Sequence, residues 1–384
     1  MTEPASEHAR LAPSSAHIWV ECPGSVAMQA AQPPEEETDE SREGTAAHWL
    51  LCQTLRKIAV PDDAVADNGV PINEEMREAI KEIVTDVTDT LKNCAPGDYF
   101  QNEARVFAHN FIHPDNDGTP DVYFIQRSRK TVHIWDFKYG HRFVDVYRCW
   151  QLVDYAACIV ESEKIDDWED WTFTFTIAQP RCYVRDELGG TLREWYTSGR
   201  ELTPLFDALR AAAHAAMQPG AHCRTGAHCL DCKAAWDCEA NQRMGGACVD
   251  LIHAQQPLGM DNAAIGLEAK VLAEAMARVK ARLAILETNA LAAIERGENV
   301  PWHKLDWSKP RVVWDKAKQA EAAQICAMFG LPVELGVALP TPTECIKQGV
   351  DAAVIKPYTC QASPAKKLAR TNQASAVKAL GNRS

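Results

Sequence analysis

Two acidic residues and one lysine near the middle of the sequence have types and spacing suited to metal-assisted phosphate chemistry. Asp121 ends the run Gly-Thr-Pro-Asp, and Phe137 alone separates Asp136 from Lys138. Side chains two apart on a strand point to one face, so Asp136 and Lys138 are expected to share a site while Phe137 enters the core. Carboxylates with waters and phosphate oxygens hold Mg²⁺, and a lysine there can steer a phosphate or help to activate a metal-bound water. These residues predict a site for a divalent cation and a phosphate group.

The segments around these residues predict a β-hairpin that brings the two acids together. Residues 121–125 and 131–135 are rich in β-branched and aromatic side chains, and a polar turn at 126–130 separates them. In the simplest register of such a hairpin, Asp121 lies beside the end that carries Asp136. The alternative interpretation is that these side chains are only solvated charges, because Asp-x-Lys alone is a weak signal.

A helix that is expected to begin near Val146 adds an amide and a phenol to this region. Gln151 and Tyr155 lie four residues apart, so that on a helix they share one face. The helix therefore predicts two polar side chains directed at the same site.

The central residues together resemble a RecB-like nuclease of the PD-(D/E)XK superfamily. The pattern of that family, G-x-x-D, D-x-K and Q-x-x-x-Y, falls here on Gly118 to Asp121, Asp136 to Lys138, and Gln151 to Tyr155. The resemblance implies an α/β fold with a restriction-endonuclease-like core, in which helices flank a mixed central sheet. It also implies a metal-dependent deoxyribonuclease in which Asp121 and Asp136 hold Mg²⁺ or Mn²⁺ and Lys138 contacts the scissile phosphate.

The same resemblance implies further residues of the active site. His48 would lie on the first helix near the metal, and Glu103 would complete the metal site from a strand. The backbone carbonyl of Phe137 would add a ligand, while Gln151 and Tyr155 would position the lysine or the DNA backbone. Without the resemblance, His48 is an ordinary surface or core histidine, and Glu103 is a solvated acid on a strand.

The charge of the chain limits how it could bind DNA. A net charge of −13 and a pI near 5.4 argue against a protein that coats DNA statically. Affinity confined to one cleft remains compatible with this charge, and the candidates to contact DNA there are Arg142, Arg148 and Arg181, with His141 nearby.

A group of cysteines carries the densest chemistry outside the central motif. Cys223, Cys229, Cys232 and Cys238 fall within sixteen residues, which in a cytosolic protein indicates metal binding rather than disulfides. The four could form a Cys₄ zinc site. Alternatively, resemblance to the iron-sulfur type of RecB-like nuclease implies that Cys22 joins Cys229, Cys232 and Cys238 around a [4Fe-4S] cluster, which leaves Cys223 as an extra candidate. In both cases the expected role is structural.

The remaining sequence predicts alternating strands and helices, followed by a mainly helical region. The expected helices are 44–58, 73–93, 202–217, 263–298 and 316–329, and the expected strands are 99–110, 171–177 and 192–197. Residues 31–43 are interpreted as an exposed loop, 302–314 as a hairpin or loop, and 332–357 as irregular with a short helix. The predicted domains are a nuclease domain at 1–245 and a C-terminal region at 246–384, whose basic tail is either solvated or follows a nucleic-acid backbone.

Residues 11 to about 240 also resemble a phage and prophage family encoded beside recombination genes. The matching segments are the Ser-rich run that ends at Cys22-Pro23, residues 43–48, Gln179-Pro-Arg181 and the cysteine group. This resemblance implies an exonuclease that prepares DNA ends for recombination with a single-strand-annealing or single-strand-binding partner. The alternative is a non-catalytic nucleic-acid-binding or scaffold protein on a nuclease fold, organised by a Cys₄ zinc site.

The sequence also predicts the cellular compartment in which the protein acts. The first eleven residues contain no apolar core of a signal peptide, and no segment reaches about 18 continuous apolar residues. We therefore expect a cytoplasmic protein without a membrane partner, which would act in the host cytoplasm if a phage encodes it.

Overall fold

A computed structural model gives the arrangement of most of the chain. It describes residues 9–33, 37–92, 94–182, 190–244, 262–309, 311–315, 318–331, 339–362, 364 and 366–370. The chain forms two compact units, residues 1–224 with 334–338 and residues 225–333 with 339–384, and each is treated by itself below. The predicted domain boundary at 245 is the first residue of a segment outside the described residues, so it stays a prediction.

The first unit is built on a mixed five-stranded sheet with the strand order β1-β4-β5-β6-β7. The strands are β1 (Tyr99–Asn102), β4 (Val122–Gln126), β5 (Thr131–Phe137), β6 (Thr172–Ala178) and β7 (Leu192–Ser198). β5 and β6 run parallel, whereas the other neighbouring strands are antiparallel. The predicted hairpin is confirmed as β4 and β5, and the α/β class with helices around a mixed sheet is confirmed as well.

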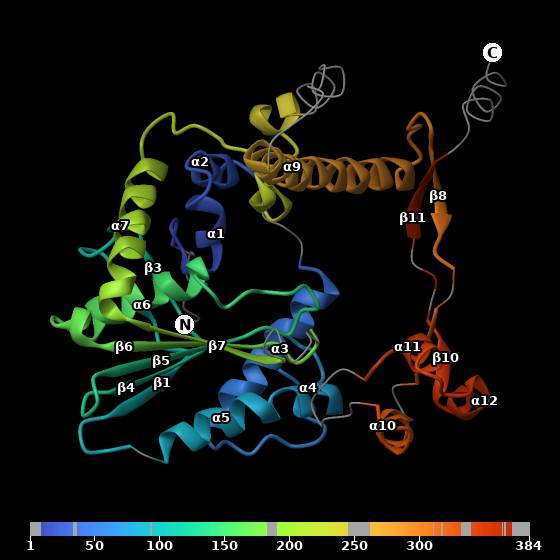
Figure 1. Cartoon of the computed structure of the whole chain (residues 1–384), viewed down its shortest axis with the longest axis horizontal. Coiled ribbons are helices and arrows are strands. Elements are labelled where there is room, and N and C mark those ends of the chain that lie inside the picture. Colours follow the sequence, from blue (N-terminus) through green and yellow to red (C-terminus); the bar gives the residue numbers. More distant parts are fainter. Residues whose placement is uncertain are drawn as a thin grey trace. The chain divides into compact units, whose positions relative to one another are not determined.

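Helices cover both faces of this sheet (Figure 1). One face carries α3 (Asp39–Leu55), α4 (Glu74–Ala79) and α5 (Lys81–Leu91), and the other carries α6 (Trp150–Ser162) and α7 (Gly199–Ala216). The two faces follow from strict alternation along the strands: Phe124 and Trp135 pack toward α3–α5, whereas Ile125 and Ile134 pack toward α6 and α7.

Smaller elements complete the first unit. They are η1 (Pro13–Ser15), α1 (Ala16–Trp19), α2 (Ser25–Ala30), η2 (Trp168–Asp170) and the short ladder of β2 (Val106–Phe107) with β3 (Asp117–Gly118).

Several predicted elements in this unit differ from the structure. The helix expected near Val146 begins at Trp150, and the helix expected at 73–93 is divided into α4 and α5. Two further boundaries are wrong for local reasons. The first helix begins at Asp39 rather than Gly44, because the Thr38 side chain accepts a hydrogen bond from Ser41 N and acids in the first turn suit the helix dipole. The predicted strand at 99–110 is interrupted, since Glu103 has φ 50°, a left-handed conformation that ends β1.

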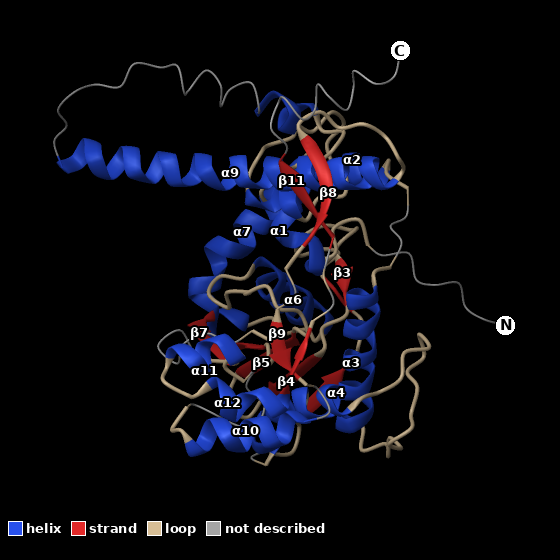
Figure 2. Cartoon of the chain, turned by 90° about the vertical axis from the view of Figure 1, so that its right-hand side faces the viewer, coloured by secondary structure: helices blue, strands red, loops and turns tan. Residues whose placement is uncertain are grey.

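The second unit contains one long helix and two small ladders. Figure 2 shows α9 (Asn262–Glu295) as a single uninterrupted helix. β8 (His303–Trp307) pairs with β11 (Lys366–Arg370), and β9 (Val312–Trp314) pairs with β10 (Thr359–Gln361). The predicted hairpin within 302–314 is therefore wrong, because β8 and β9 each take a partner from beyond residue 358.

Short helices form a small core in this unit. They are α10 (Gln319–Met328), α11 (Pro342–Lys347) and α12 (Ala352–Ile355), followed by η6 (Lys356–Tyr358), while η4 (Ala227–Leu230) contacts α9 instead. The segment 332–357, predicted to be irregular or to carry a short helix, thus contains α11 and α12. The core contains Cys326, Leu331, Cys345, Val350 and Ile355. The first part of the basic tail forms β11, and residues 371–384 lie outside the described residues.

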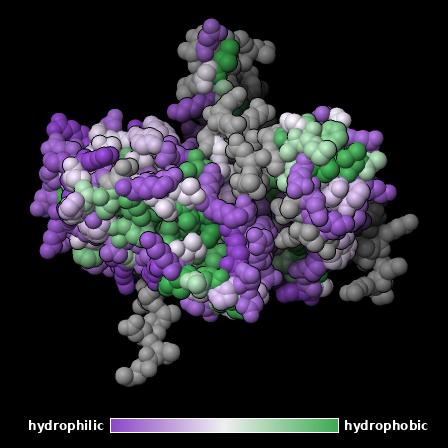
Figure 3. Space-filling view, turned by 90° about the horizontal axis from the view of Figure 1, so that it is seen from below, coloured by the Kyte–Doolittle hydropathy of each residue, from purple (hydrophilic) through white to green (hydrophobic). Residues whose placement is uncertain are grey.

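Hydrophilic and hydrophobic residues are mixed on the face seen from below (Figure 3). Figure 3 shows hydrophilic residues over much of one face, interrupted by smaller hydrophobic patches. Among the helices of the described residues, none is long and apolar enough to cross a membrane.

Candidate active site

The β-hairpin sets the distance between the two predicted carboxylates. Val122 pairs with Trp135, so Asp121 and Asp136 come directly before and after paired residues at one end of the hairpin. Asp121 Oδ2 accepts a hydrogen bond from the backbone N–H of Phe137 at 2.7 Å. The register expected from the sequence is thus confirmed, and it fixes Asp121 beside the strand that carries Asp136.

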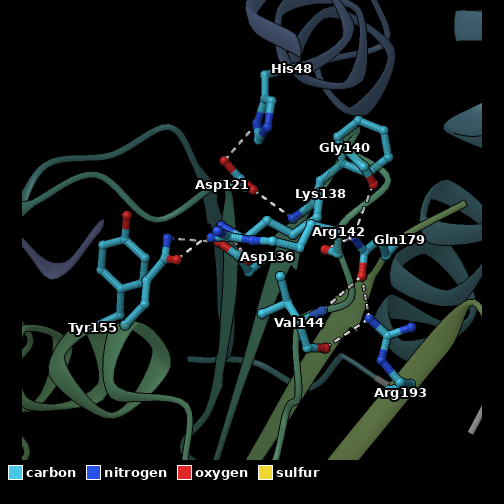
Figure 4. A network of polar contacts seen from close by, with 12 residues as sticks. His48, Asp121, Asp136, Lys138, Gly140, Arg142, Val144, Tyr155, Gln179 and Arg193 are labelled. Carbon is cyan, nitrogen blue, oxygen red and sulfur yellow. Dashed lines mark hydrogen bonds and ion pairs between the residues drawn. The ribbon is translucent and has the colours of Figure 1, made fainter. Parts of the chain in front are cut away.

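Asp136, Lys138 and Gln151 form a closed triangle of hydrogen bonds. Figure 4 labels two of its members, Asp136 and Lys138. Gln151 Nε2 donates to Asp136 Oδ1 at 2.9 Å, and Lys138 Nζ donates to Gln151 Oε1 at 2.9 Å. Lys138 Nζ also donates to Asp136 Oδ1 at 3.1 Å. The predicted common face of Asp136 and Lys138 is confirmed, and Phe137 between them is fully buried.

The second carboxylate oxygen of Asp136 is the least satisfied atom of this triangle. Oδ2 is buried and lies 2.8 Å from Lys138 Nζ, but it has no hydrogen bond in good geometry. Burial raises the pKa of Asp136, although Lys138 opposes the shift. Burial also acts to lower the pKa of Lys138, but Asp136 outweighs it, so that pKa is raised and the ammonium stays charged. A buried carboxylate oxygen that accepts no hydrogen bond keeps a lone pair for a metal ion, which would share this oxygen with the Lys138 ammonium.

His48 lies on α3, which covers the face of the sheet opposite to α6, and its side chain contacts Asp121. His48 Nδ1 lies 2.9 Å from Asp121 Oδ1. Burial acts to lower the pKa of His48, but the neighbouring Asp121 outweighs it and raises that pKa. Burial acts to raise the pKa of Asp121, but the charge and hydrogen bond of His48 outweigh burial. The pKa of Asp121 is therefore lowered, and the carboxyl is ionised. A cation bound to Asp121 would compete with the His48 proton.

Glu103 joins this pair at the mouth of a pocket. One ligand atom each of His48, Glu103 and Asp121 lie within 4.8 Å of one another, as a metal site requires. Glu103 is exposed to solvent, yet partial burial of its carboxyl group and the charge of Asp121 raise its pKa to about 7. The structure therefore brings together the three residues that the resemblance implied, although Glu103 follows a strand instead of lying within one.

A pocket of about 650 Å³ opens onto these residues along one face of α3. Its lining is Ser41, Gly44, Thr45, His48, Trp49, Cys52, Gln53, Arg56, Asp67, Glu103 and Asp121. Arg56 brings a positive charge to this lining, and its guanidinium Nε donates to Asn102 Oδ1 at 3.2 Å. Sequence reasoning missed Arg56, but its signal was present, since residues four and eight positions after His48 share its helix face.

Tyr155 holds the turn that leads into Asp121. Its hydroxyl donates to the carbonyl oxygen of Thr119 at 3.1 Å, and its side chain is 6% exposed. Gly118 must be glycine here, because a Cβ would lie 2.7 Å from Pro13 Cδ and 3.1 Å from Tyr155 Cε1. The G-x-x-D run and the tyrosine are thus parts of one packed turn that positions Asp121.

The match to a known family covers most of this architecture. A profile described as "Protein of unknown function (DUF2800)" matches residues 8–330 of the 384-residue chain. This chain belongs to the DUF2800 family. The matched region includes the candidate site, the five-stranded sheet and the cysteine group, and the family description names no reaction.

Gln179 organises the loop of the DUF2800 protein that follows Lys138. Its Nε2 donates to the carbonyl oxygens of Gly140 and Arg142 at 2.9 and 2.7 Å, and its Oε1 accepts from Val144 N at 3.2 Å (Figure 4). Arg193 Nη2 donates to the same Oε1 at 2.7 Å. The sequence indicated Gln179 only as part of a family motif, and its role as a loop clamp was missed.

One arginine expected to contact DNA has partners inside the DUF2800 protein. Arg181 pairs with Glu75 at 2.9 Å and with Glu43 at 3.2 Å, and its guanidinium lies over the ring of Tyr139 at 3.7 Å. Its side chain is 14% exposed. A phosphate contact would require these ion pairs to open, so the structure gives Arg181 a bracing role between α3 and α4.

Arg142 and Arg148 of the DUF2800 protein are exposed on the loop between β5 and α6. Arg148 has φ 52° and lies 5.4 Å from the ring centroid of Tyr147. His141 on the same loop lies 3.0 Å through its Nδ1 from the carbonyl oxygen of Arg181. A role in DNA binding stays a prediction for both arginines.

Two of the cysteines predicted to bind metal, Cys22 and Cys229, accept backbone hydrogen bonds through their sulfur atoms. In the first unit, buried Cys22 accepts from Arg224 N at 3.2 Å, and a Cβ on Gly24 would lie 2.6 Å from Cys223 Sγ. In the second unit, buried Cys229 accepts from Gly226 N at 3.4 Å. Cys238 is buried, Cys232 is partly buried, and none of the described cysteines is in a disulfide. Whether iron, sulfide or zinc binds stays a prediction.

Proposed function

We propose that this member of the DUF2800 family is a metal-dependent DNA nuclease of the PD-(D/E)XK, RecB-like type that hydrolyses phosphodiester bonds. The observation that carries the proposal is the buried Asp136 Oδ2, which has no hydrogen bond and lies 2.8 Å from the Lys138 ammonium. Asp121 lies at the same end of the hairpin, bonded to the backbone of Phe137. An acidic pair with one fixed cation matches the needs of phosphate hydrolysis.

The donor set suits Mg²⁺ or Mn²⁺. Asp121, Asp136 and Glu103 offer carboxylate oxygens, His48 offers a nitrogen, and the carbonyl of Phe137 would add an oxygen. When bound, such an ion lowers the pKa of a water molecule and offsets negative charge on the phosphate. The Asp136 oxygen that accepts no hydrogen bond supports this use of the residues.

Lys138 supplies a fixed positive charge rather than a base. Its ammonium donates to Asp136 and Gln151, and its pKa is raised, so it does not accept a proton near neutral pH. Held in this geometry, it can contact a phosphate oxygen and stabilise the charge that develops in the transition state. Gln151 fixes the position of the Lys138 ammonium, and Tyr155 fixes the turn that carries Asp121.

Two parts of the proposal rest on the sequence resemblance. The first is an exonuclease that prepares DNA ends for phage recombination beside a single-strand-annealing or single-strand-binding protein. The second is a [4Fe-4S] cluster on Cys22, Cys229, Cys232 and Cys238, with a zinc site that includes Cys223 as the alternative. Backbone N–H groups donate to the sulfur atoms of Cys22 in one unit and Cys229 in the other, which supports a role for these two sulfur atoms as metal ligands. Equal amounts of iron and acid-labile sulfide in brown purified protein support the cluster, whereas one zinc in colourless protein refutes it.

Cleavage of end-labelled linear and closed circular DNA tests the activity. The wild type is compared with Asp136→Asn, Lys138→Ala and the matched control Lys130→Ala, with Mg²⁺, Mn²⁺ or EDTA. Lys130 is exposed and paired with Asp167, away from the two acids. Metal-dependent loss of linear DNA alone, abolished by the first two substitutions and kept by the third, establishes the exonuclease. No cleavage by well-folded wild type on either DNA contradicts the proposal and favours the non-catalytic binding protein.

A further inference from the structure

A second group of metal-ligating side chains lies on the face of the sheet that α3–α5 cover. Asp86 comes from α5, His133 from β5 and Glu194 from β7, and one ligand atom of each lies within 4.8 Å of the other two. His133, Trp135 and Phe137 are every second residue of β5, so their side chains lie on this same face, whereas Asp136 points to the other face. We propose that Asp86, His133 and Glu194 form a second divalent-cation site, suited to Zn²⁺, that joins α5 to the sheet.

Each of these residues is held by an outer hydrogen bond. His133 Nε2 lies 2.7 Å from Thr176 Oγ1, which leaves Nδ1 as a possible ligand. Trp135 Nε1 donates to Asp86 Oδ2 at 2.6 Å and leaves the other oxygen of that carboxylate.

The third residue is held in the same way. The hydroxyl of Tyr196 donates to Glu194 Oε2, again leaving one carboxylate oxygen. Metal sites in proteins are typically built like this, with one atom of each ligand oriented by a neighbour so that the other can bind.

The surroundings of this group suit a bound cation. Asp86 and His133 are partly buried, whereas Glu194 is exposed. Among the described residues, no lysine or arginine forms a salt bridge with Asp86 or Glu194. A bound cation would give these two acids a partner of opposite charge.

The donor chemistry points to zinc. One neutral imidazole with two carboxylates gives three ligands, and Zn²⁺ accepts this set at four-coordinate sites. Glu194 is exposed, so solvent can supply the fourth position. Because the three ligands come from a helix, a central strand and the edge strand, bound zinc would stabilise the covering of the sheet by α5.

Zinc titration of the purified full chain tests this site. Calorimetry with Zn²⁺ in excess Mg²⁺ compares the wild type with Glu194→Gln and Asp86→Asn, which keep the side-chain shapes. Any zinc on the cysteines is common to all samples and cancels in the comparison. Asp89→Asn, on an exposed side chain of the same helix α5, is the matched control. We expect both variants to lose one equivalent of zinc that the wild type and Asp89→Asn retain.

A variant of an outer partner separates a built site from a chance cluster. Tyr196→Phe removes only the hydroxyl that orients Glu194, and it should weaken zinc binding by about tenfold or more. Zinc stoichiometry and affinity that are the same in the wild type, Glu194→Gln and Asp86→Asn would overturn the inference, whatever the nuclease assay shows. Because the readout is binding, its failure is distinct from failure of the proposed nuclease activity.

Discussion

Gln151 donates through Nε2 to Asp136 Oδ1 across 2.9 Å, so a helix residue fixes the orientation of a carboxylate at the end of β5. The oxygen of the same amide accepts from Lys138 Nζ at 2.9 Å. An amide can make both bonds at once, because its NH₂ group donates to the acid and its oxygen accepts from the ammonium. The sequence pattern D-x-K with a glutamine on the next helix thus corresponds to one hydrogen-bonded unit.

Replacing this amide tests its positioning role. Gln151→Ala removes both bonds while leaving Asp136 and Lys138 in place, so DNA cleavage should slow by about 10- to 100-fold, the usual effect of losing an orienting partner. Steady-state kinetics should show the loss mainly in kcat. Gln101→Ala, on the exposed side of β1, is the control and should cleave like the wild type. A Gln151→Ala enzyme with full kcat would show that the amide orients nothing that reacts.

Arg56 should contribute to substrate binding through the pocket along α3. It is the arginine of the pocket lining, so Arg56→Gln should raise KM for DNA several-fold and flatten the dependence of binding on salt. Lys57→Gln changes the same charge one residue later on an exposed side chain and should have little effect. Fluorescence anisotropy with labelled DNA in EDTA measures binding without cleavage. Equal losses in both variants would indicate a general charge effect instead of a pocket contact.

Asp154 should make the protein less stable as pH rises. Burial raises its pKa to about 8, whereas the unfolded chain ionises this carboxyl near its usual pKa of about 3.9. Its contribution to stability is therefore complete below about pH 4 and is lost as pH rises toward about 8. Asp154→Asn resembles the neutral acid and should raise the free energy of unfolding by a few kcal/mol at about pH 8, with little change at about pH 4.

Urea unfolding at several pH values measures this difference. The control is Asp89→Asn on the exposed side of α5, which should leave the pH dependence of stability unchanged. An Asp154→Asn variant whose advantage is the same at every pH would show that the Asp154 carboxyl does not titrate as its burial requires.

The parts of the fold that the sequence predicted are those governed by local patterns. The hairpin follows from β-branched residues around a polar turn, and the common face of Asp136 and Lys138 follows from strand alternation. The same reasoning failed at Glu103, because one residue with φ 50° ends the strand and no composition rule indicates it. Thr38 was a missed signal, since a threonine before two acids is a good N-cap.

The parts that the sequence could not predict depend on distant partners. Arg181 looked like a phosphate ligand at the end of a strand, yet its guanidinium pairs with Glu43 and Glu75 more than a hundred positions away. No prediction was made for His133, because the side chains near it, Asp86 and Glu194, come from α5 and β7. Single-sequence patterns describe one element at a time, whereas these contacts exist only between elements.

Gly118 should be the most sensitive glycine of the motif, because its neighbours leave no room for a side chain. A Cβ would approach Pro13 Cδ to 2.7 Å and Tyr155 Cε1 to 3.1 Å, so Gly118→Ala must displace η1 or the tyrosine that holds Thr119. Overpacking of this kind typically costs about 1–3 kcal/mol of stability. The displaced turn carries Asp121, so cleavage should also fall beyond the fraction of protein that unfolds.

Gly266→Ala is the contrasting change for this test. Its Cβ would meet nothing within 4 Å on α9, so better helix propensity should leave stability equal or raise it by up to about 1 kcal/mol. Thermal unfolding and cleavage rates measured on both variants separate the two sites. If Gly118→Ala unfolds and cleaves like Gly266→Ala, the G-x-x-D glycine is not needed for packing. In that case the turn before Asp121 is set by Tyr155 and the hairpin register alone.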